Sequence, residues 1–505
     1  MRNMWEKLPK DQKEKYKKLI VNFASLSEAF AQKANNRGSI TPIVNSKFQE
    51  AAFQRAFKAT VEDIANSSYD ASIKTDDGKA YLVGIKSFGI GSGDQKIAQF
   101  KAQSVEWIQD IQDLHKTKGK DINEISFANN AIYMRLAKKI SNLRNERIHS
   151  SREQLHGFRF KLFNPEEVYH VLMPSKRGEP LQIHVGEIPY NEIDINKLKI
   201  LGPTSRNNPS NFRFTDDKHI YKYTSADSQL YMTFNNQDIV VESWDVSYID
   251  DALSFFEDLT SSNLIKEEIK CYESYSWPII VQPFSGFNAF YGGSKLSKSD
   301  REQRILKIEE LYKSKINSKG LDQVIDYLKE ILLTKRQTDD KKKKMILVRS
   351  KLLDLVNSFH NAELINDITK LVFRPVSEMY IPIPEARQFH ANHPQFFGDN
   401  IARLKAGKSS LELPKDQRTF TLKLLPSGDE LLAYICQDCG KGIQSYNEQG
   451  ILGEWILRKV FQLQEYEPLT QTKLNELGIN GLRFTKLDKG VIGLEFIWSD
   501  DYVDI

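Results

Sequence analysis

The stretch "YDASIKTDDGKAYLVGIKSF", residues 69–88, decides how the first part of this chain folds. Two strand-like runs flank a polar turn at residues 76–78, and the Asp-Asp-Gly sequence of that turn is typical of a hairpin. We therefore predict two antiparallel strands. Asp70 lies at the start of the first strand and Lys86 lies within the second. The pattern thus predicts an acid and a lysine on neighbouring strands.

A helix is predicted directly before this hairpin. The segment "NSKFQEAAFQRAF", residues 45–57, carries apolar side chains at helical spacing, and Asn45 or Ser46 can cap its first turn. Glu50 lies on this helix. From there its carboxylate can approach the hairpin.

The order of helix, hairpin, helix and further strands predicts a mixed α/β first domain over residues 1–262. A lysine-rich, mostly helical middle region is expected over 263–372, and a β-rich domain over 373–505. Within this plan, we expect one helix over about 95–115 and another near 125–145.

One charged stretch inside the middle region is ambiguous. The sequence "TDDKKKKMILVRSKLLDLV", residues 338–356, combines four consecutive lysines with apolar residues. We interpret it as a loop between two helices. Runs of like charge are usually solvated.

Composition indicates an ordinary globular protein. The chain has 505 residues, 40% hydrophobic and 27% charged, and a net charge of +4. Its three cysteines are too few for a disulfide framework and suit a reducing compartment. No apolar run approaches the roughly 20 residues of a membrane span. We expect a soluble, DNA-associated protein of the bacterial cytoplasm.

The hairpin carries residue types that suit metal-dependent phosphodiester cleavage. Such chemistry needs carboxylates to hold Mg²⁺, and a positive group beside the attacked phosphate. Alternation along the second strand puts Gly84 and Lys86 on one face and Ile85 on the other. An ordinary solvated hairpin would also place an acid and a lysine on adjacent strands, where their pairing contributes little.

Asp70 followed by Gly84-Ile85-Lys86, with Glu50 on the preceding helix, resembles the PD-(D/E)XK nuclease signature. The resemblance implies a restriction-endonuclease-like α/β core, Mg²⁺ dependence and DNA as substrate. It implies that Asp70 binds metal, that Lys86 is catalytic, and that the backbone carbonyl of Ile85 is a further metal ligand.

This sequence departs from that signature at Gly84, where the family mostly has an acid or glutamine. Two replacements are open. Glu50 can supply the missing carboxylate to the metal and to catalysis, and we favour it. Asp94, in the segment after the lysine, is the reserve metal ligand.

A second resemblance covers residues 373–505. The segments "YIPIPEARQFHANHPQFFG", "CQDCGKGIQS", "LGEWIL" and "LTQTKLNELGINGLRF" occur in an order similar to the C-terminal domain of NgoFVII-type restriction endonucleases. That resemblance implies a DNA-recognition pseudobarrel. For residues 373–505 it implies only a role in reading DNA, and no catalytic role.

Polar side chains on three predicted loops suit DNA contacts, because amides read adenine edges while lysine and arginine read guanine or phosphate. Each can equally be a plain surface residue. In the third domain the candidates are Lys415, Gln417, Arg418, Lys441, Gln444, Ser445 and Asn447. In the loop at residues 202–214 they are Arg206, Asn208 and Arg213.

Together these features predict a Mg²⁺-dependent type II restriction endonuclease that cuts double-stranded DNA as a homodimer or transient dimer. One alternative is a modification-dependent nuclease, which needs an aromatic-lined pocket for a flipped base in the third domain. The other is a DNA-binding protein with a decayed nuclease fold, for which Gly84 is the main argument.

Overall fold

The computed structural model describes residues 4–30, 40–61, 69–101, 103–157, 165–249, 251–254, 272–291, 297–334, 339–448 and 450–499. The chain is a mixed α/β protein with three β-sheets and helices. It forms two compact units: Met1–Cys271 with Asn475–Ile479, and Tyr272–Leu474 with Asn480–Ile505. The division into three domains stays a prediction.

The first unit contains a six-stranded sheet in the order β1-β2-β3-β5-β6-β11. Its strands are β1 (Thr60–Val61), β2 (Ala71–Lys74), β3 (Ala80–Ser87), β5 (Glu166–Pro174), β6 (Gln182–Pro189) and β11 (Val240–Asp245). Strands β2 and β3 form the predicted hairpin, with Ala71 opposite Val83 and Lys74 opposite Ala80. On its other side β3 pairs with β5 in parallel.

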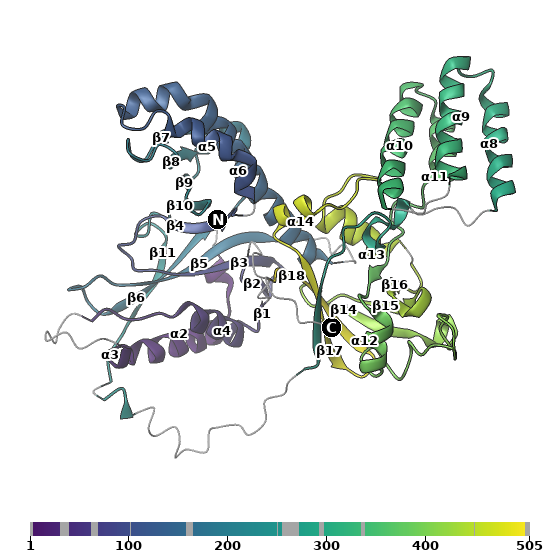
Figure 1. Ribbon diagram of the computed structural model, residues 1–505. Coiled ribbons are helices and arrows are strands. Elements are labelled where there is room, and N and C mark those ends of the chain that lie inside the picture. Colours follow the sequence, from purple (N-terminus) through teal and green to yellow (C-terminus); the bar gives the residue numbers. More distant parts are fainter. Residues whose placement is uncertain are drawn as a thin grey trace. The chain divides into compact units, whose positions relative to one another are not determined.

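Helices cover one face of this sheet (Figure 1). They are α2 (Lys10–Ser25) and α4 (Ser46–Phe57), and the short helices α1 (Met4–Lys7) and α3 (Ser27–Phe30) adjoin α2 along the chain. The Asn45 side chain accepts a hydrogen bond from the Phe48 amide and caps α4, which confirms the predicted helix start. Phe53 of α4 is buried in one apolar cluster with Val83 and Ile85 of β3.

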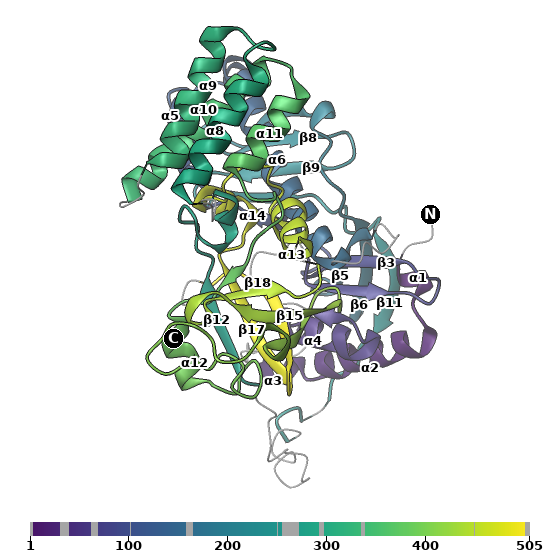
Figure 2. The same cartoon turned by 90° about the vertical axis from the view of Figure 1, so that its right-hand side faces the viewer.

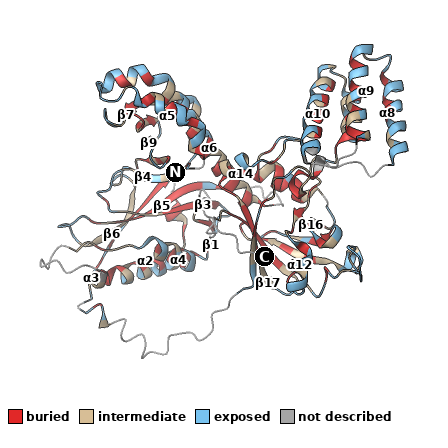
Figure 3. Ribbon diagram, viewed as in Figure 1, coloured by how far each residue is buried: buried red, intermediate tan, exposed pale blue. Residues whose placement is uncertain are grey.

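The opposite face packs on a second core that includes Leu82 of β3 and Tyr169 of β5. This core is completed by a five-stranded sheet in the order β4-β10-β9-β8-β7 and by two helices. The elements are β4 (Gln95–Gln99), α5 (Ile108–His115), α6 (Ile122–His156), β7 (Lys199–Pro203), β8 (Phe212–Thr215), β9 (Ile220–Thr224) and β10 (Gln229–Met232). Strands β3 and β5 are thus covered on both faces (Figure 3).

Two sequence predictions are wrong. The segment 95–115 begins as strand β4, not as a helix, because Gln95 and Gln99 pair with Met232 and Gln229 of β10. Sheet pairing here overrides the helical preference of a glutamine-rich segment. The described part of the stretch 338–356, residues 339–356, is helical and belongs to α10 (Asp339–Ser358). Its apolar residues recur at three- and four-residue spacing and are buried: Met345, Val348, Leu352 and Val356.

The second unit combines helices with a seven-stranded sheet in the order β12-β17-β18-β14-β15-β16-β13 (Figure 2). The helices are α8 (Lys298–Tyr312), α9 (Ser318–Leu333), α10 and α11 (Ala362–Val372), which share one core, and the short α12 (Ala386–Asn392) and α13 (Ile451–Gly453). The strands are β12 (Ser274–Pro278), β13 (Ile381–Pro382), β14 (Thr419–Leu424), β15 (Glu430–Cys436), β16 (Gly442–Ser445), β17 (Gly481–Asp488) and β18 (Val491–Ile497), and α14 (Gln471–Leu477) precedes β17.

Strands β14 and β18 pair in parallel, and the other pairs of this sheet are antiparallel. Strand β12 comes from the region that was expected to be a helical linker. Over the described ranges none of the three sheets closes into a barrel. Every helix in those ranges is too short or too polar to cross a lipid bilayer.

Candidate functional site

Asp70 is held against β3 by two hydrogen bonds. Its backbone N–H donates to the Val83 carbonyl at 2.9 Å, and its Oδ2 accepts from the Ile85 N–H at 2.6 Å. The carboxylate therefore takes the next position in the β2–β3 ladder, beyond the pair formed by Ala71 and Val83. Because a charge-assisted bond of this length is strong, the carboxylate position is well defined.

Three charged side chains and one backbone amide act on this carboxylate. Burial raises the pKa of Asp70 most. The Lys86 ammonium, the Ile85 amide and the Lys47 ammonium lower it and Glu50 raises it, so that the pKa stays above its usual value. A raised pKa means that the bare anion is disfavoured where it stands. A bound cation would relieve this, so Asp70 is suited to hold one.

Glu50 lies on α4 and pairs with Lys47 one turn earlier, with Nζ 2.9 Å from Oε2. The structure thus brings Glu50, Asp70 and Lys86 into one electrostatic environment, as the sequence reasoning requires. Among the described residues there is no group of three His, Cys, Asp or Glu side chains able to hold a metal ion. Two carboxylates remain, and the role of the Ile85 carbonyl stays a prediction.

The structure explains why residue 84 is glycine. Gly84 lies opposite Tyr169 in the parallel β3–β5 pair. A Cβ atom added at Gly84 would lie 2.5 Å from Cδ1 of Tyr169. That ring cannot easily retreat, because it is stacked on Tyr190 with ring centroids 4.3 Å apart. The space that a carboxylate would need at position 84 is therefore occupied by an aromatic ring.

A cavity of about 160 Å³ lies beside Lys86. Lys96 of β4, Arg144 and Arg147 of α6, and the Tyr169–Tyr190 stack also line it. The sequence reasoning missed these residues. A signal was present: Arg144 and Arg147 stand at positions of α6 where helical spacing from Ile140 calls for buried apolar residues.

Asp94 is held by other partners. Its Oδ2 lies 2.6 Å from Arg213 and 2.9 Å from Lys222, and its Oδ1 accepts from the Thr233 hydroxyl at 2.7 Å. Burial raises the pKa of Asp94, but the hydrogen bonds from these three residues outweigh burial and hold the pKa below its usual value. Asp94 is not among the charges that act most strongly on Asp70.

Of the three DNA-contact candidates in the first unit, Arg213 is thus paired with Asp94. Arg206 is exposed, and its carbonyl accepts from the Gly119 amide at 2.8 Å. The side chain of Asn208 accepts from the Ser210 hydroxyl at 2.9 Å. Arg206 is therefore the most accessible of the three.

The candidates in the second unit divide into exposed and engaged side chains. Gln417, Lys441 and Asn447 are exposed. Lys415 donates to the Tyr446 carbonyl at 3.1 Å and lies within 4.6 Å of the Tyr434 and Tyr446 ring centroids.

The other three candidates of this unit are engaged with neighbouring strands and turns. Arg418 donates to the Ile435 carbonyl, and Gln444 accepts from the Tyr434 hydroxyl at 2.9 Å. Ser445 is buried at the end of β16 and donates to the Glu448 carbonyl. Gln444 and Ser445, which were predicted to lie on a loop, thus belong to strand β16.

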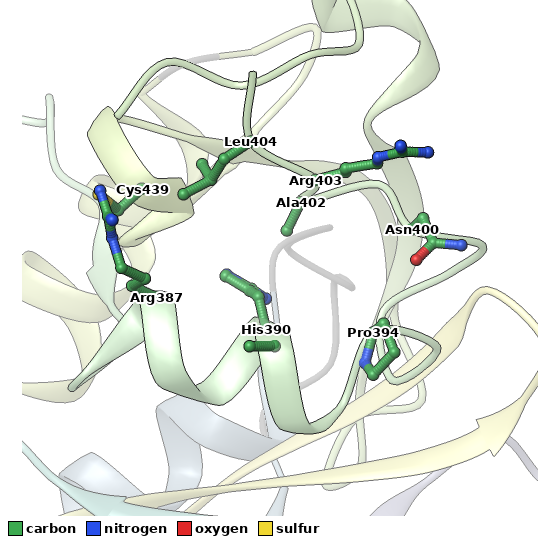
Figure 4. A pocket seen from close by; sticks show the side chains of 9 residues that line it. Arg387, His390, Pro394, Asn400, Ala402, Arg403, Leu404 and Cys439 are labelled. Carbon is green, nitrogen blue, oxygen red and sulfur yellow. The ribbon is translucent and has the colours of Figure 1, made fainter. Parts of the chain in front are cut away.

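A cavity of about 400 Å³ lies in the second unit beside α12 (Figure 4). The guanidinium of Arg387 and the thiol of Cys439 lie close together on one wall, with Nη2 3.6 Å from Sγ. Burial lowers the pKa of His390, whose Nε2 lies 2.9 Å from the Gly440 carbonyl oxygen. The described lining includes no Phe, Tyr or Trp, so it lacks the aromatic walls expected around a flipped base.

No protein-family model matches this chain, and no curated protein is significantly similar to it.

Proposed function

We propose that this protein is a Mg²⁺-dependent endonuclease of the restriction type, acting on double-stranded DNA. The observation that carries the proposal is the Asp70 carboxylate, partly buried and bonded to β3, with Lys86 and Glu50 acting on it. This is the arrangement that the PD-(D/E)XK resemblance requires, with Glu50 in place of an acid at position 84.

The donor chemistry suits Mg²⁺, which prefers carboxylate and carbonyl oxygens and keeps several waters. Asp70 and Glu50 would hold the ion, with the Ile85 carbonyl as a further ligand. When bound, the ion supplies Lewis-acid activation and charge neutralisation. Lys86 orients the attacking water and stabilises the charge that develops on the phosphate. The Ile85 N–H keeps Asp70 in position while this happens.

Incubation of supercoiled plasmid with the native chain and Mg²⁺ tests the proposal. We expect nicked and linear DNA from the native chain, no cleavage in EDTA, and a loss of at least about 100-fold for Lys86→Ala, as for removal of a charge-stabilising group. Lys79→Ala is the matched control, since Lys79 lies on the same hairpin in an exposed pair with Glu166. Equal cleavage by the native and Lys86→Ala chains would refute the assignment.

One observation favours a DNA-binding protein without nuclease activity as the second candidate. Tyr169 fills the space next to Gly84, and the described residues provide two carboxylates rather than three. If the native chain binds DNA but never cuts it with Mg²⁺ or Mn²⁺, this second function is the correct one.

The remaining parts of the proposal concern the second unit and assembly. Its seven-stranded sheet would correspond to the DNA-recognition pseudobarrel, with Gln417, Lys441 and Asn447 as its most exposed candidate contacts. Cutting both strands requires two active sites, so we propose a homodimer or a transient dimer on DNA. For a modification-dependent nuclease, the cavity beside α12 offers no support, because its described lining residues include no Phe, Tyr or Trp.

A further inference from the structure

The cavity beside Lys86 concentrates positive charge. Lys86, Lys96, Arg144 and Arg147 all line it, and no carboxylate does so among the described residues. Arg144 and Arg147 are three residues apart and therefore lie on the same side of α6. Four cations around one small cavity repel one another unless an anion enters it.

Arg144 is only 3% exposed, and no ion pair with a carboxylate is described for it. One of its terminal nitrogens donates to the Asn191 carbonyl at 3.1 Å, and its guanidinium lies 5.3 Å from the Tyr190 ring centroid. The other terminal nitrogen is buried and has no partner in good hydrogen-bond geometry among the described residues, although the Tyr169 hydroxyl acts on the guanidinium. The Tyr190 hydroxyl likewise has no described partner in good geometry. A buried guanidinium whose described hydrogen-bond partners are neutral groups is suited to accept an anion.

Arg147 is also bonded to neutral groups alone. It donates to the carbonyls of Gln99 at 2.8 Å and Glu476 at 2.7 Å. Burial lowers the pKa of Arg147 to about 10, which still leaves it charged at neutral pH. Both arginines are thus held in place as cations by neutral hydrogen-bond acceptors, and no ion pair is described for either.

The size and walls of the cavity limit what can fill it. A volume of about 160 Å³ holds on the order of five water molecules. This is enough for a phosphate group with one or two waters, and too little for a whole nucleotide. The stacked Tyr169 and Tyr190 rings form an apolar wall that leaves the cations as the main binding groups.

We propose that this cavity binds a phosphate group, between Arg144 and Lys96 and next to Lys86. The source of this phosphate follows from the proposed nuclease function and rests on it. The phosphate then belongs to the DNA backbone near the bond to be cut. Tyr190 connects the two sites, since both Arg144 and Asp70 act electrostatically on its hydroxyl. A backbone phosphate held there would position the neighbouring phosphodiester against Asp70 and Lys86.

Binding measurements in EDTA test this without any need for cleavage. Inorganic phosphate is titrated against the full chain by calorimetry, and a 5′-hydroxyl DNA duplex by fluorescence anisotropy at fixed ionic strength. We expect Lys96→Gln to weaken both ligands about fivefold, a change of about 1 kcal/mol. Arg144→Gln should abolish phosphate binding. Since Arg144 is buried, circular dichroism must first show that the Arg144→Gln variant folds. If it does not fold, the Lys96→Gln variant tests the site, because Lys96 is exposed.

Lys101→Gln is the matched control, because Lys101 is an exposed lysine just after β4 that does not line the cavity. Its affinities should stay within twofold of native. Equal phosphate affinity of the native and Lys96→Gln chains would overturn the site. Loss of phosphate binding with unchanged duplex affinity would overturn the DNA backbone as the source and leave a site for free phosphate.

The two proposals fail separately. A native chain that never cuts DNA, but loses phosphate affinity on Lys96→Gln, disproves the nuclease and keeps the phosphate site. A chain that cuts with Mg²⁺, and binds phosphate and duplex equally well with or without Lys96, keeps the nuclease and disproves the phosphate site.

Discussion

Asp70 and Asp94 are both partly buried acids of the first unit, yet their surroundings differ. Asp94 has two cations and a hydroxyl on its oxygens, and its pKa lies below the usual value. Asp70 has an amide N–H on one oxygen and a nearby lysine, and burial holds its pKa above the usual value. Asp94 is already neutralised by the protein, whereas Asp70 is not.

The difference separates a carboxylate that stabilises the fold from one that is available to a ligand. A metal ion at Asp94 would have to displace Arg213 and Lys222, both within 3 Å of Oδ2. At Asp70 it would instead relieve the unfavourable burial of charge. Of the two acids considered at the sequence level, the geometry therefore favours Glu50 over Asp94 as the second ligand.

The largest expected contrast concerns cleavage. Asp70→Asn should reduce Mg²⁺-dependent plasmid cleavage by at least about 1,000-fold, because it removes a metal-binding charge but keeps an acceptor for the Ile85 amide. Asp94→Asn should stay within about threefold of native at 20 °C. Initial rates of nicking measure both. If Asp94→Asn strongly reduced cleavage while Asp70→Asn kept the native rate, the comparison would be reversed.

The next effect concerns the ring that fills the space beside Gly84. Gly84→Ala should lower the free energy of unfolding by about 2 kcal/mol, since the added methyl group overlaps Tyr169. In the Tyr169→Ala background the same change should be nearly neutral. Urea denaturation of the four chains measures this coupling. Additive effects would show that Tyr169 is not what excludes a side chain at position 84.

Stability should change in opposite directions at the two acids. At pH 7 we expect Asp94→Asn to destabilise the protein by about 1–2 kcal/mol, because it leaves two cations beside a neutral amide. Asp70→Asn should stabilise it by about 1 kcal/mol, because it removes a charge that is unfavourable where it is buried. Chemical denaturation at pH 7 measures both differences.

The pH dependence of these differences has a definite sign. The folded pKa of Asp94 is depressed, so its stabilisation is present above the unfolded pKa of about 4 and is lost as pH falls through the folded value. The folded pKa of Asp70 is raised, so protonated Asp70 favours the folded state. This contribution to stability is fully present below about pH 4 and is lost as the pH rises through the folded pKa. Both variants should therefore approach native stability at acidic pH. A stabilising effect of Asp70→Asn that persisted below pH 3 would contradict this.

The smallest effect is expected at Lys47. Its pair with Glu50 has one largely exposed partner, so Lys47→Ala should change stability by less than about 0.5 kcal/mol. Removing this competitor for Glu50 should lower the Mg²⁺ concentration for half-maximal cleavage by about twofold. Metal titrations of the cleavage rate measure the shift. An increased Mg²⁺ requirement would indicate that Lys47 supports the site instead.

Local patterns allowed the hairpin and α4 to be predicted. The turn at residues 76–78 and the Asn45 cap are short-range sequence signals, and the folded protein contains both the hairpin and the capped helix. The strand β4 was missed because its partner β10 lies more than a hundred residues later in the chain, and the sequence near Gln95 shows no sign of that pairing. Glu50, Asp70 and Lys86 could be grouped because one helix and one hairpin carry them.

The aromatic ring beside Gly84 and the two buried arginines could not be placed in the same way. Tyr169 reaches Gly84 only through the parallel β3–β5 pairing, which joins distant parts of the sequence. Arg144 and Arg147 do interrupt the apolar side of α6, and a search for charges at core positions would have found them. What they face depends on β4 and β5, which the helix itself does not specify.

The parallel pairing of β3 and β5 also bears on how the protein reaches its native state. The β2–β3 hairpin closes a short loop, so the strands carrying Asp70 and Lys86 can meet within microseconds. We expect the β3–β5 contact to form more slowly, because it joins distant parts of the sequence and the entropic cost of closing a loop grows with loop length. On this expectation Tyr169 joins Gly84 after the hairpin has formed. A chain stalled before that step would display the acid and the lysine without the cavity beside them.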